Sequence, residues 1–220
     1  MDASVWDKKY SEEEFVYGQE PNVHVRQAAE RYLNQVPGGA LVVELASGEG
    51  RNVAYLAAAG HRVIAVDFSQ AGLDKTMALV AGRGGGSATA RVTPVLADMT
   101  AWAPPGGPGS VDAVVLSFCH MRAADRPRVM AAVVEWLKPG GLLIQEVFHP
   151  SQVHKGYRET SGGPHDPTMM VELQELRSQL GDKGGEELEG EELEYVLEEG
   201  KLHNGMGAVT RYVWRKDPAQ

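Results

Sequence analysis

The sequence predicts an α/β fold, with a mostly parallel sheet of seven strands, helices on both faces and an antiparallel strand pair at the C-terminus. Between residues 40 and 148, short apolar runs alternate with stretches of helical periodicity, which is typical of βαβ units. Glycine and proline turns separate these segments. Beyond residue 190, apolar and polar side chains alternate, as they do in half-buried strands.

The N-terminal part is expected to form a cap followed by a helix. Residues 6–22 carry aromatic side chains among acidic ones and are expected to be irregular or helical. Asn22 follows a proline and is a plausible helix N-cap. Apolar residues recur at helical spacing from Val25 to Val36, and Pro37-Gly38-Gly39 is expected to end this helix.

The central part predicts the parallel sheet. Buried strands are expected over residues 40–45, 62–66, 91–96, 112–117 and 142–148. Helices are expected over residues 51–59, from Ser69 through Val80, and from Asp125 through Leu137. The glycine-rich segment 82–87 is expected to be a loop, and Pro139-Gly140-Gly141 a tight turn. Right-handed crossovers between such strands lead to a doubly wound sheet.

The C-terminal part has a different pattern. Residues 169–180 predict a helix, and residues 192–197 and 208–215 predict an antiparallel strand pair. The glutamate-rich stretch 186–199 is interpreted as a solvated flank of this pair. A chain of 220 residues suits a single domain, here residues 1–220. Its expected parts are an N-terminal cap and helix (1–38), a cofactor-binding core (39–148) and a substrate-side helix and hairpin (149–220).

Composition excludes several classes of function. A net charge of -9 argues against a nucleic-acid-binding surface, which needs clustered lysine and arginine. The start of the chain lacks the apolar region of a secretory signal, and no apolar run approaches the roughly 18 residues that span a membrane. The single cysteine, Cys119, excludes an internal disulfide and suits a reducing compartment, so a cytoplasmic location is expected. The histidine spacing predicts no metal site.

The turn after the first predicted strand carries the clearest chemical signal. Gly48 and Gly50 let a ligand approach the backbone at the start of a helix. Asp67 ends the second strand, where it can accept hydrogen bonds from ribose hydroxyls. Val53 stands where a dinucleotide fingerprint needs glycine or alanine, and Glu44 suits a cationic amino-acid ligand better than a pyrophosphate. The spacing therefore favours S-adenosylmethionine over NAD.

These segments resemble the motifs of class I S-adenosylmethionine-dependent methyltransferases. The core of the resemblance is residues 44–52, 66–69 with 72–73, 97–99, and 137–141. Flanking segments resemble the bacterial tellurite-resistance methyltransferase and its thiopurine-methyltransferase-like relatives. They are Trp6-Asp7 with Tyr10, Tyr17-Gly18 with Glu20-Pro21-Asn22, Gly162-Gly163-Pro164, and Glu199-Gly200 with His203 and Gly205. The resemblance covers nearly the whole chain and implies a Rossmann-like fold.

The resemblance also implies roles for individual residues in binding S-adenosylmethionine and its product S-adenosylhomocysteine. Glu44, Ser47, Gly48 and Gly50 would surround the methionine part, Asp67 would bind the ribose, and Asp98 the adenine amino group. Phe68 and Met99 would lie against the adenine ring, and Tyr17 and Asn22 would close the site. Further candidates are Ala46, Arg51, Asn52, Ser69 and Ser117. Ala46 replaces the usual first glycine of the motif and Ser47 its frequent cysteine; a methyl group at position 46 requires a negative φ.

The candidates for handling the methyl acceptor are histidines that follow strand ends or lie in the predicted hairpin connection: His120, His149 and His203. Each could instead cap a loop or face solvent. Arg122 could attract an anionic acceptor, although a surface position suits it better, and Cys119 is interpreted as a small core residue rather than a nucleophile.

The leading hypothesis is methyl transfer to a small-molecule acceptor, a thiol or chalcogenide, by a monomer or homodimer without nucleic-acid or membrane partners. The alternatives are a methyltransferase acting on RNA or protein, a cofactor-binding protein without catalysis, and a nicotinamide-dependent oxidoreductase.

Overall fold

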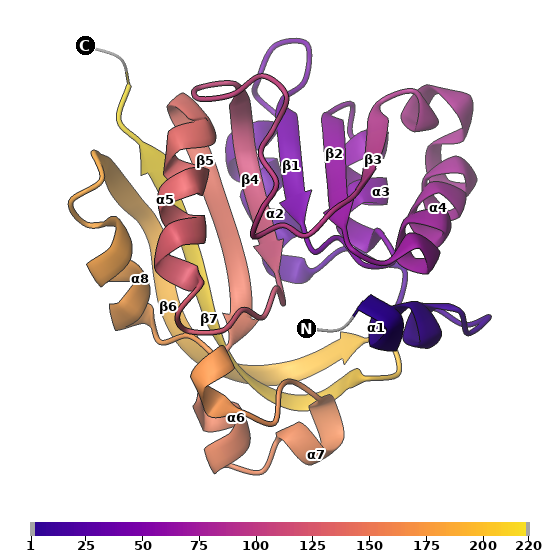
Figure 1. Cartoon of the computed structure of the whole chain (residues 1–220), viewed down its shortest axis with the longest axis vertical. Helices are drawn as coiled ribbons and strands as arrows, with labels where there is room; N and C mark the ends of the chain where they lie inside the picture. Colours follow the sequence, from indigo (N-terminus) through magenta and orange to yellow (C-terminus); the bar gives the residue numbers. More distant parts are fainter. Residues whose placement is uncertain (1–2, 219–220) are drawn as a thin grey trace. The chain divides into compact units, whose positions relative to one another are not determined.

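The computed structural model describes residues 3–218 and divides the chain into two compact units (Figure 1). The first unit consists of residues 1–102 and 199–201, and the second of residues 103–198 and 202–220. The strands form a mostly parallel seven-stranded sheet with an antiparallel C-terminal pair, which confirms the predicted fold class. No helix among residues 3–218 is long and apolar enough to cross a membrane.

The first unit contains the three parallel strands that carry the predicted cofactor motifs. They are β1 (Leu41–Leu45), β2 (Arg62–Asp67) and β3 (Val92–Leu96), with β2 between the other two. Leu45 pairs with Val66, and Asp67 pairs with Leu96, so the carboxyl ends of these strands lie together. Most of β1 and β2 is buried, which is why these strands are continuous apolar runs in the sequence.

Helices α3 (Arg51–Ala58) and α4 (Gln70–Thr89) follow β1 and β2 and pack against one another. The expected loop at residues 82–87 is wrong, because α4 continues through it with a break at Gly85. Gly85 has φ 58° and ψ -155°, a conformation that glycine adopts without a steric penalty. The hydroxyls of Ser87 and Thr89 donate to carbonyls beside the break, so helical turns resume after it.

The N-terminal part forms α1 (Ala3–Tyr10), α2 (Val23–Ala28) and a π-helical turn, η1 (Ala29–Leu33). The predicted N-cap is confirmed: the side chain of Asn22 accepts a hydrogen bond of 3.0 Å from the Val25 amide. The helix ends at Leu33 instead of Val36, and residues 34–38 form the turn into β1.

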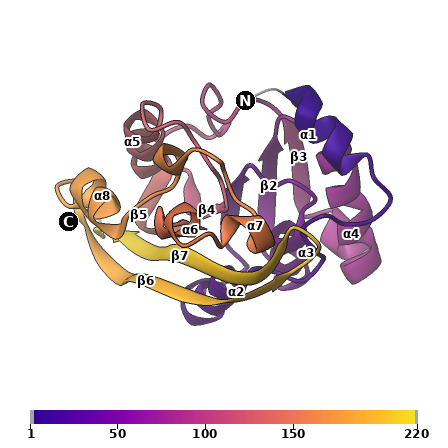
Figure 2. The same ribbon diagram turned by 90° about the horizontal axis from the view of Figure 1, so that it is seen from below.

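The second unit contains β4 (Val111–Ser117), β5 (Leu137–Phe148), β6 (Gly185–Glu199) and β7 (His203–Lys216), the last residue of β6 belonging to the first unit. β4 and β5 are parallel, and β5 pairs antiparallel with β7. Figure 2 shows β6 and β7 running side by side as one curved ribbon. Both are longer than the predicted 192–197 and 208–215, so His203 begins β7 rather than lying in the hairpin connection.

The helices of the second unit are α5 (Arg126–Trp136), α6 (Ser151–His154), α7 (Arg158–Ser161), the 3-10 turn η2 (Pro167–Met169) and α8 (Leu173–Leu180). Leu137, expected in the helix, instead has an extended backbone and opens β5 two residues before Pro139. The predicted helix over 169–180 begins at Leu173, since residues 166–169 form the 3-10 turn capped by Asp166. Figure 2 shows α6 and α7 beside β7.

Candidate functional site

The turn between β1 and α3 has the left-handed backbone that a glycine-rich loop needs. Gly48 and Gly50 have φ of 55° and 80°, and Ala46 has φ 55° as well. The expectation of a negative φ at Ala46 is therefore wrong. The loop takes the same course that a glycine would allow, and the Ala46 methyl group is held in a strained conformation.

Replacing this alanine tests the strain. Ala46→Gly is expected to raise the free energy of unfolding by roughly 1 kcal/mol, because glycine has no Cβ to clash at positive φ. Urea unfolding would measure it. Ala58→Gly, in the exposed end of α3, is the matched control and should lower stability by about 1 kcal/mol. A loss of stability in both variants would contradict the strain at Ala46.

Gly50 must be glycine for a second reason, the close approach of α4. A Cβ at this position would lie 2.5 Å from the Thr76 side chain. The Thr76 hydroxyl donates a 3.0 Å hydrogen bond to the Gly48 carbonyl, which fixes the loop against α4. The glycines therefore serve packing as well as ligand approach.

Glu44 is a buried carboxylate with one oxygen left over. It is 2% exposed, and its Oε1 accepts a 2.7 Å hydrogen bond from the Asn52 side chain. Its Oε2 is buried without a hydrogen-bond partner. Burial raises the pKa of Glu44 to about 7. A buried carboxylate oxygen without a donor is a binding position for a cation, and it fits the ammonium of an amino-acid ligand.

Asp67 organises the backbone around this loop. Its Oδ2 accepts a 2.8 Å hydrogen bond from the Gly48 amide, and its Oδ1 accepts one of 2.9 Å from the Ser69 amide. Burial raises the pKa of Asp67, although these two amides oppose the shift. Each carboxylate oxygen can accept a further bond, so ribose hydroxyls remain compatible with this arrangement. Ser69 caps α4 through a bond from the Gly72 amide.

The buried Glu49, which the sequence motifs did not single out, holds the N-terminal segment against the loop. Its Oε2 accepts from the amides of Val16 and Tyr17 at 2.8 and 3.3 Å, and its Oε1 pairs with Lys75 at 2.8 Å. Tyr17 is thereby placed beside the glycine turn. The only signal in the sequence was a charged residue between two glycines of a turn expected to be buried.

The remaining cofactor candidates have varied surroundings. Asp98 is exposed and accepts bonds of 2.8 Å from the Thr100 amide and hydroxyl, which form a turn after β3. Phe68 and Met99 are half-buried. Ser47 and Ser117 each have a buried hydroxyl without a hydrogen-bond partner, Ser117 in the second unit. Both hydroxyls are therefore available to a ligand.

In the second unit, the predicted histidines His120 and His203 join two phenylalanines that the sequence reasoning missed. The ring of His120 stacks on Phe148, with centroids 5.5 Å apart and an angle of 5° between the planes. His203 packs against Phe118 at 4.5 Å and against Phe148 at 5.2 Å. Phe118 has φ 48°, a strained value for a bulky residue. We call Phe118, His120, Phe148 and His203 the aromatic cluster.

His120 is held neutral in this cluster. Neither ring nitrogen is exposed, and neither makes a hydrogen bond of good geometry. Burial, with His203 nearby, lowers the pKa of His120 to about 3. At neutral pH the imidazole is therefore uncharged, which suits an orienting role better than that of a stored proton donor.

The same shift predicts acid sensitivity. The pKa of His120 is about 3 in the folded protein and about 6.5 unfolded, so the stabilising contribution is complete above pH 6.5 and is lost as the pH falls toward 3. In urea unfolding, the free energy of unfolding of the wild type should fall by about 1–2 kcal/mol between pH 7 and pH 5, and His120→Phe should remove this fall. The exposed His154→Phe should leave that fall unchanged. Equal acid sensitivity in wild type and His120→Phe would contradict the buried neutral state.

His149 acts locally as a helix cap. Its Nδ1 accepts from the Ser151 amide at 3.1 Å and lies 3.0 Å from the Ser151 hydroxyl, at the start of α6. Its Nε2 lies 3.6 Å from Glu192. This arrangement favours the alternative of a capping histidine, and it separates the role of His149 from that of His120 and His203.

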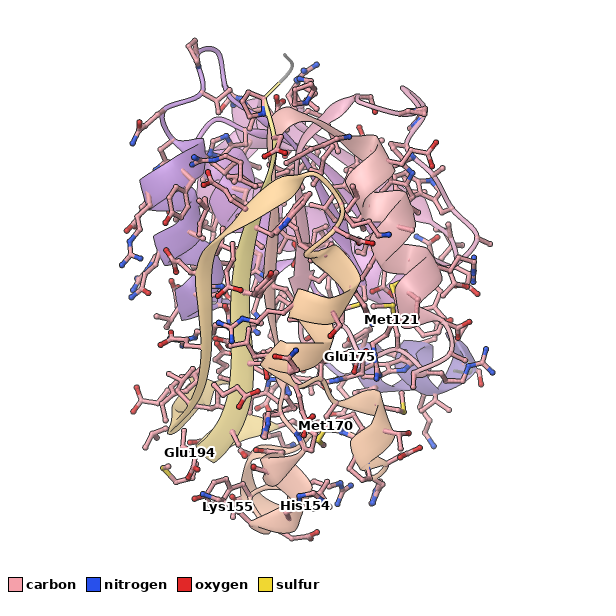
Figure 3. All side chains as sticks on the ribbon, turned by 90° about the vertical axis from the view of Figure 1, so that its left-hand side faces the viewer. Met121, His154, Lys155, Met170, Glu175 and Glu194 are labelled. Atoms are coloured by element: carbon pink, nitrogen blue, oxygen red, sulfur yellow. The ribbon has the colours of Figure 1, made fainter. Side chains whose placement is uncertain are left out.

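Arg126 links the loop that carries His120 to η2 and α8. Its guanidinium binds Glu175 of α8 through bonds of 2.6 and 2.9 Å, and donates to the carbonyls of Met121 and Thr168 at 3.2 and 2.8 Å. Figure 3 shows Met121 and Glu175 on the neighbouring segments that it joins. The loop that carries His120 is therefore tied to α8. Among residues 3–218, no group of histidine, cysteine or acidic side chains could hold a metal ion.

Residues 42–141 match the family model described as a methyltransferase domain. No curated protein sequence matches the chain.

Solved structures share the fold at low identity. A Burkholderia thailandensis 1,6-didemethyltoxoflavin-N1-methyltransferase, with bound 1,6-didemethyltoxoflavin and S-adenosylhomocysteine, is 20% identical with a TM-score of 0.59, covering 89% of this chain and 79% of its own. A protein that converts a disulfide bond into a thioacetal group during echinomycin biosynthesis is 16% identical with a TM-score of 0.73, covering 99% and 93%. A cyclase of the 4+2 type is 15% identical with a TM-score of 0.65, covering 99% and 96%.

Proposed function

We propose that the chain, whose residues 42–141 match the methyltransferase-domain model, uses S-adenosylmethionine to methylate a small molecule through a soft nucleophile, a thiol or a chalcogenide. The aromatic cluster carries the proposal for the acceptor. It combines polarisable aromatic rings with the imidazole of His120, which is neutral at pH 7. A thiol, with a pKa near about 8.5, loses its proton with little help, whereas hydroxyls and amines need a stronger base.

The chain's own residues have the following roles in this proposal. S-adenosylmethionine supplies a methyl group on a sulfonium, which the acceptor takes by in-line displacement. Glu44 binds the ammonium of the cofactor, and Asp67 its ribose. His120 orients the acceptor through a ring nitrogen and stays neutral itself. The acceptor would take the methyl group as its bond to the cofactor's sulfur is broken, would release its own proton to solvent, and would leave S-adenosylhomocysteine as the product. Positioning of this kind can lower a barrier by roughly 7–11 kcal/mol.

Two of the similar structures support a small acceptor and differ on the reacting atom. The toxoflavin-related enzyme is an N1-methyltransferase, so its acceptor atom is nitrogen. The echinomycin protein acts on a disulfide, so its chemistry is at sulfur. The neutral imidazole of His120 favours sulfur or a heavier chalcogen for this chain.

The test has two steps on the full-length protein. Calorimetric titration with S-adenosylmethionine and S-adenosylhomocysteine should give micromolar binding that Asp67→Ala abolishes. Formation of S-adenosylhomocysteine is then measured with a thiol, a selenide, tellurite, a nitrogen heterocycle, bulk RNA and a protein lysate. Turnover with thiol or chalcogenide supports the proposal. Turnover only with the heterocycle, RNA or protein would replace the acceptor class, and no cofactor binding by folded protein would sink the proposal.

A second candidate is a cofactor-binding protein that does not transfer methyl groups. The similar 4+2 cyclase supports it, because a cyclase does not catalyse methyl transfer. Tight binding of S-adenosylmethionine without turnover on any acceptor in the screen would favour this candidate.

A further inference from the structure

Residues 199–201, the end of β6 and the start of its connection to β7, pack against the N-terminal segment within the first unit. Gly200 has φ 76°, and a Cβ there would lie 2.2 Å from the Gly18 amide nitrogen, so no side chain fits. The Lys201 amide donates a 3.0 Å hydrogen bond to the Val16 carbonyl. These contacts seat the connection firmly on residues 16–18.

Glu199, the last residue of β6, is an 8% exposed carboxylate that binds two groups. Its Oε1 accepts a 2.9 Å hydrogen bond from the Asn22 side chain, and its Oε2 forms a 2.7 Å ion pair with Arg51. Arg51 was a candidate for direct cofactor binding, but the structure places its charge against Glu199. The pair is buried, so each partner depends on the other for compensation.

From Asn22, hydrogen bonds continue to the cofactor candidates. The backbone N–H of Asn22 donates a 2.8 Å bond to the Asn52 side-chain oxygen, and the Asn52 side-chain nitrogen donates a 2.7 Å bond to Oε1 of Glu44. The side-chain amide groups of Asn22 and Asn52 each donate one hydrogen bond and accept another, so only one orientation of each group satisfies its partners. We call the series Glu199, Asn22, Asn52 and Glu44 the relay. It ends at Oε1 of Glu44, and the other oxygen of the same carboxylate, Oε2, has no hydrogen-bond partner.

We infer that Glu199 is a positioning residue for the cofactor: through Asn22 and Asn52 it orients the Glu44 carboxylate and thereby sets the affinity for the cofactor's ammonium group. The inference rests on the proposed function, because it assumes that Glu44 binds this cation. The relay joins residue 199 to Glu44 in β1, although the two are far apart in the sequence.

The charges around Glu44 give a readout that a merely structural role would not move. Arg51 lowers the pKa of Glu44, whereas Asp67 raises it, both less strongly than burial does. Glu199 neutralises Arg51, so removing the Glu199 charge strengthens the effect of Arg51 on Glu44. The pH midpoint at which S-adenosylhomocysteine binding strengthens should therefore fall in Glu199→Gln.

The experiment is calorimetric titration of the full chain with S-adenosylhomocysteine, with folding checked by urea unfolding. Asn22→Asp keeps the oxygen that caps α2 but places a second carboxylate against Glu199, and should weaken binding about tenfold or more. Combining Asn22→Asp with Glu199→Gln restores a donor facing an acceptor and should recover most of that loss. The exposed neighbour Glu198→Gln is the control and should bind as wild type does.

The outcomes separate the two claims. Absence of binding by the wild type would overturn the proposed function, and this inference with it. Wild-type binding with unchanged affinity in Asn22→Asp would overturn the relay alone. So would a double variant no better than Asn22→Asp, or a pH midpoint in Glu199→Gln equal to that of the wild type.

Discussion

Glu44→Gln is expected to weaken binding of S-adenosylmethionine by about 100-fold or more, because it removes a buried charge that faces the ligand's ammonium. The replacement has the same shape, and its side-chain oxygen can still accept the bond from Asn52. The loss would therefore report the missing charge and not a collapsed pocket. Calorimetric titration of folded wild type and variant would measure it.

The pH dependence of stability and of ligand binding tests the charge of Glu44 independently. The pKa of Glu44 is about 7 in the folded protein, above its unfolded value, so its contribution to stability is present below about pH 4.5 and lost as the pH rises through 7. Without ligand, Glu44→Gln should therefore be more stable than wild type at pH 8, by about 1–3 kcal/mol. The wild type should bind the ligand more tightly as the pH rises from 6 to 7.5, and the variant should not.

The exposed Asp74→Asn on α4 removes a charge without touching the turn and is the matched control. Two results would contradict the assignment of Glu44 to the cofactor's ammonium. One is a Glu44→Gln variant that binds as tightly as wild type; the other is wild-type affinity that does not change between pH 6 and 7.5.

The parallel strands could be predicted from the sequence because strands buried on both faces are continuous apolar runs. The same pattern located the turn after β1, so Glu44, Gly48, Gly50 and Asp67 were expected at the ends of neighbouring strands and lie there. Local periodicity was sufficient for these features, because each depends on a few consecutive residues.

Other features depend on contacts that no local pattern encodes. Asn22 and Glu199 are 177 positions apart, and nothing in either segment indicates that they meet. Glu49 was passed over because two of its partners are backbone amides, which every sequence contains, and the third, Lys75, lies 26 positions away. The positive φ of Ala46 could not be predicted from composition either, because tertiary contacts of the loop override the local preference of alanine.

Arg211→Leu is expected to lower the free energy of unfolding by about 3–5 kcal/mol, the largest stability effect in the second unit. Arg211 of β7 binds Glu146 of β5, which is 0% exposed. Removing the guanidinium leaves a buried carboxylate that accepts a 2.9 Å hydrogen bond from the Tyr195 hydroxyl but has lost its ion pair. Urea unfolding of the variant would measure the loss.

Two further variants show whether the ion pair or the volume of the side chain matters. Arg211→Leu combined with Glu146→Leu removes both charges and should recover most of the stability, since an apolar pair replaces a buried ion pair at little cost. Arg177→Leu breaks the half-exposed pair with Glu187, at 2.7 Å, and should cost no more than about 1 kcal/mol. Equal losses in Arg211→Leu and Arg177→Leu would contradict the buried charge as the cause.

The same substitution also reaches the aromatic cluster through the backbone. The Glu146 carbonyl accepts a 2.7 Å hydrogen bond from the Phe118 amide, which helps to hold Phe118 at its strained φ. If Glu146 shifts to hydrate its unpaired carboxylate, this bond and the packing of His120 on Phe148 should loosen together. Arg211→Leu should then lose the acid sensitivity assigned to His120, and the double variant should regain it. Retention of that sensitivity in Arg211→Leu would mean that the cluster holds its geometry independently of the buried ion pair.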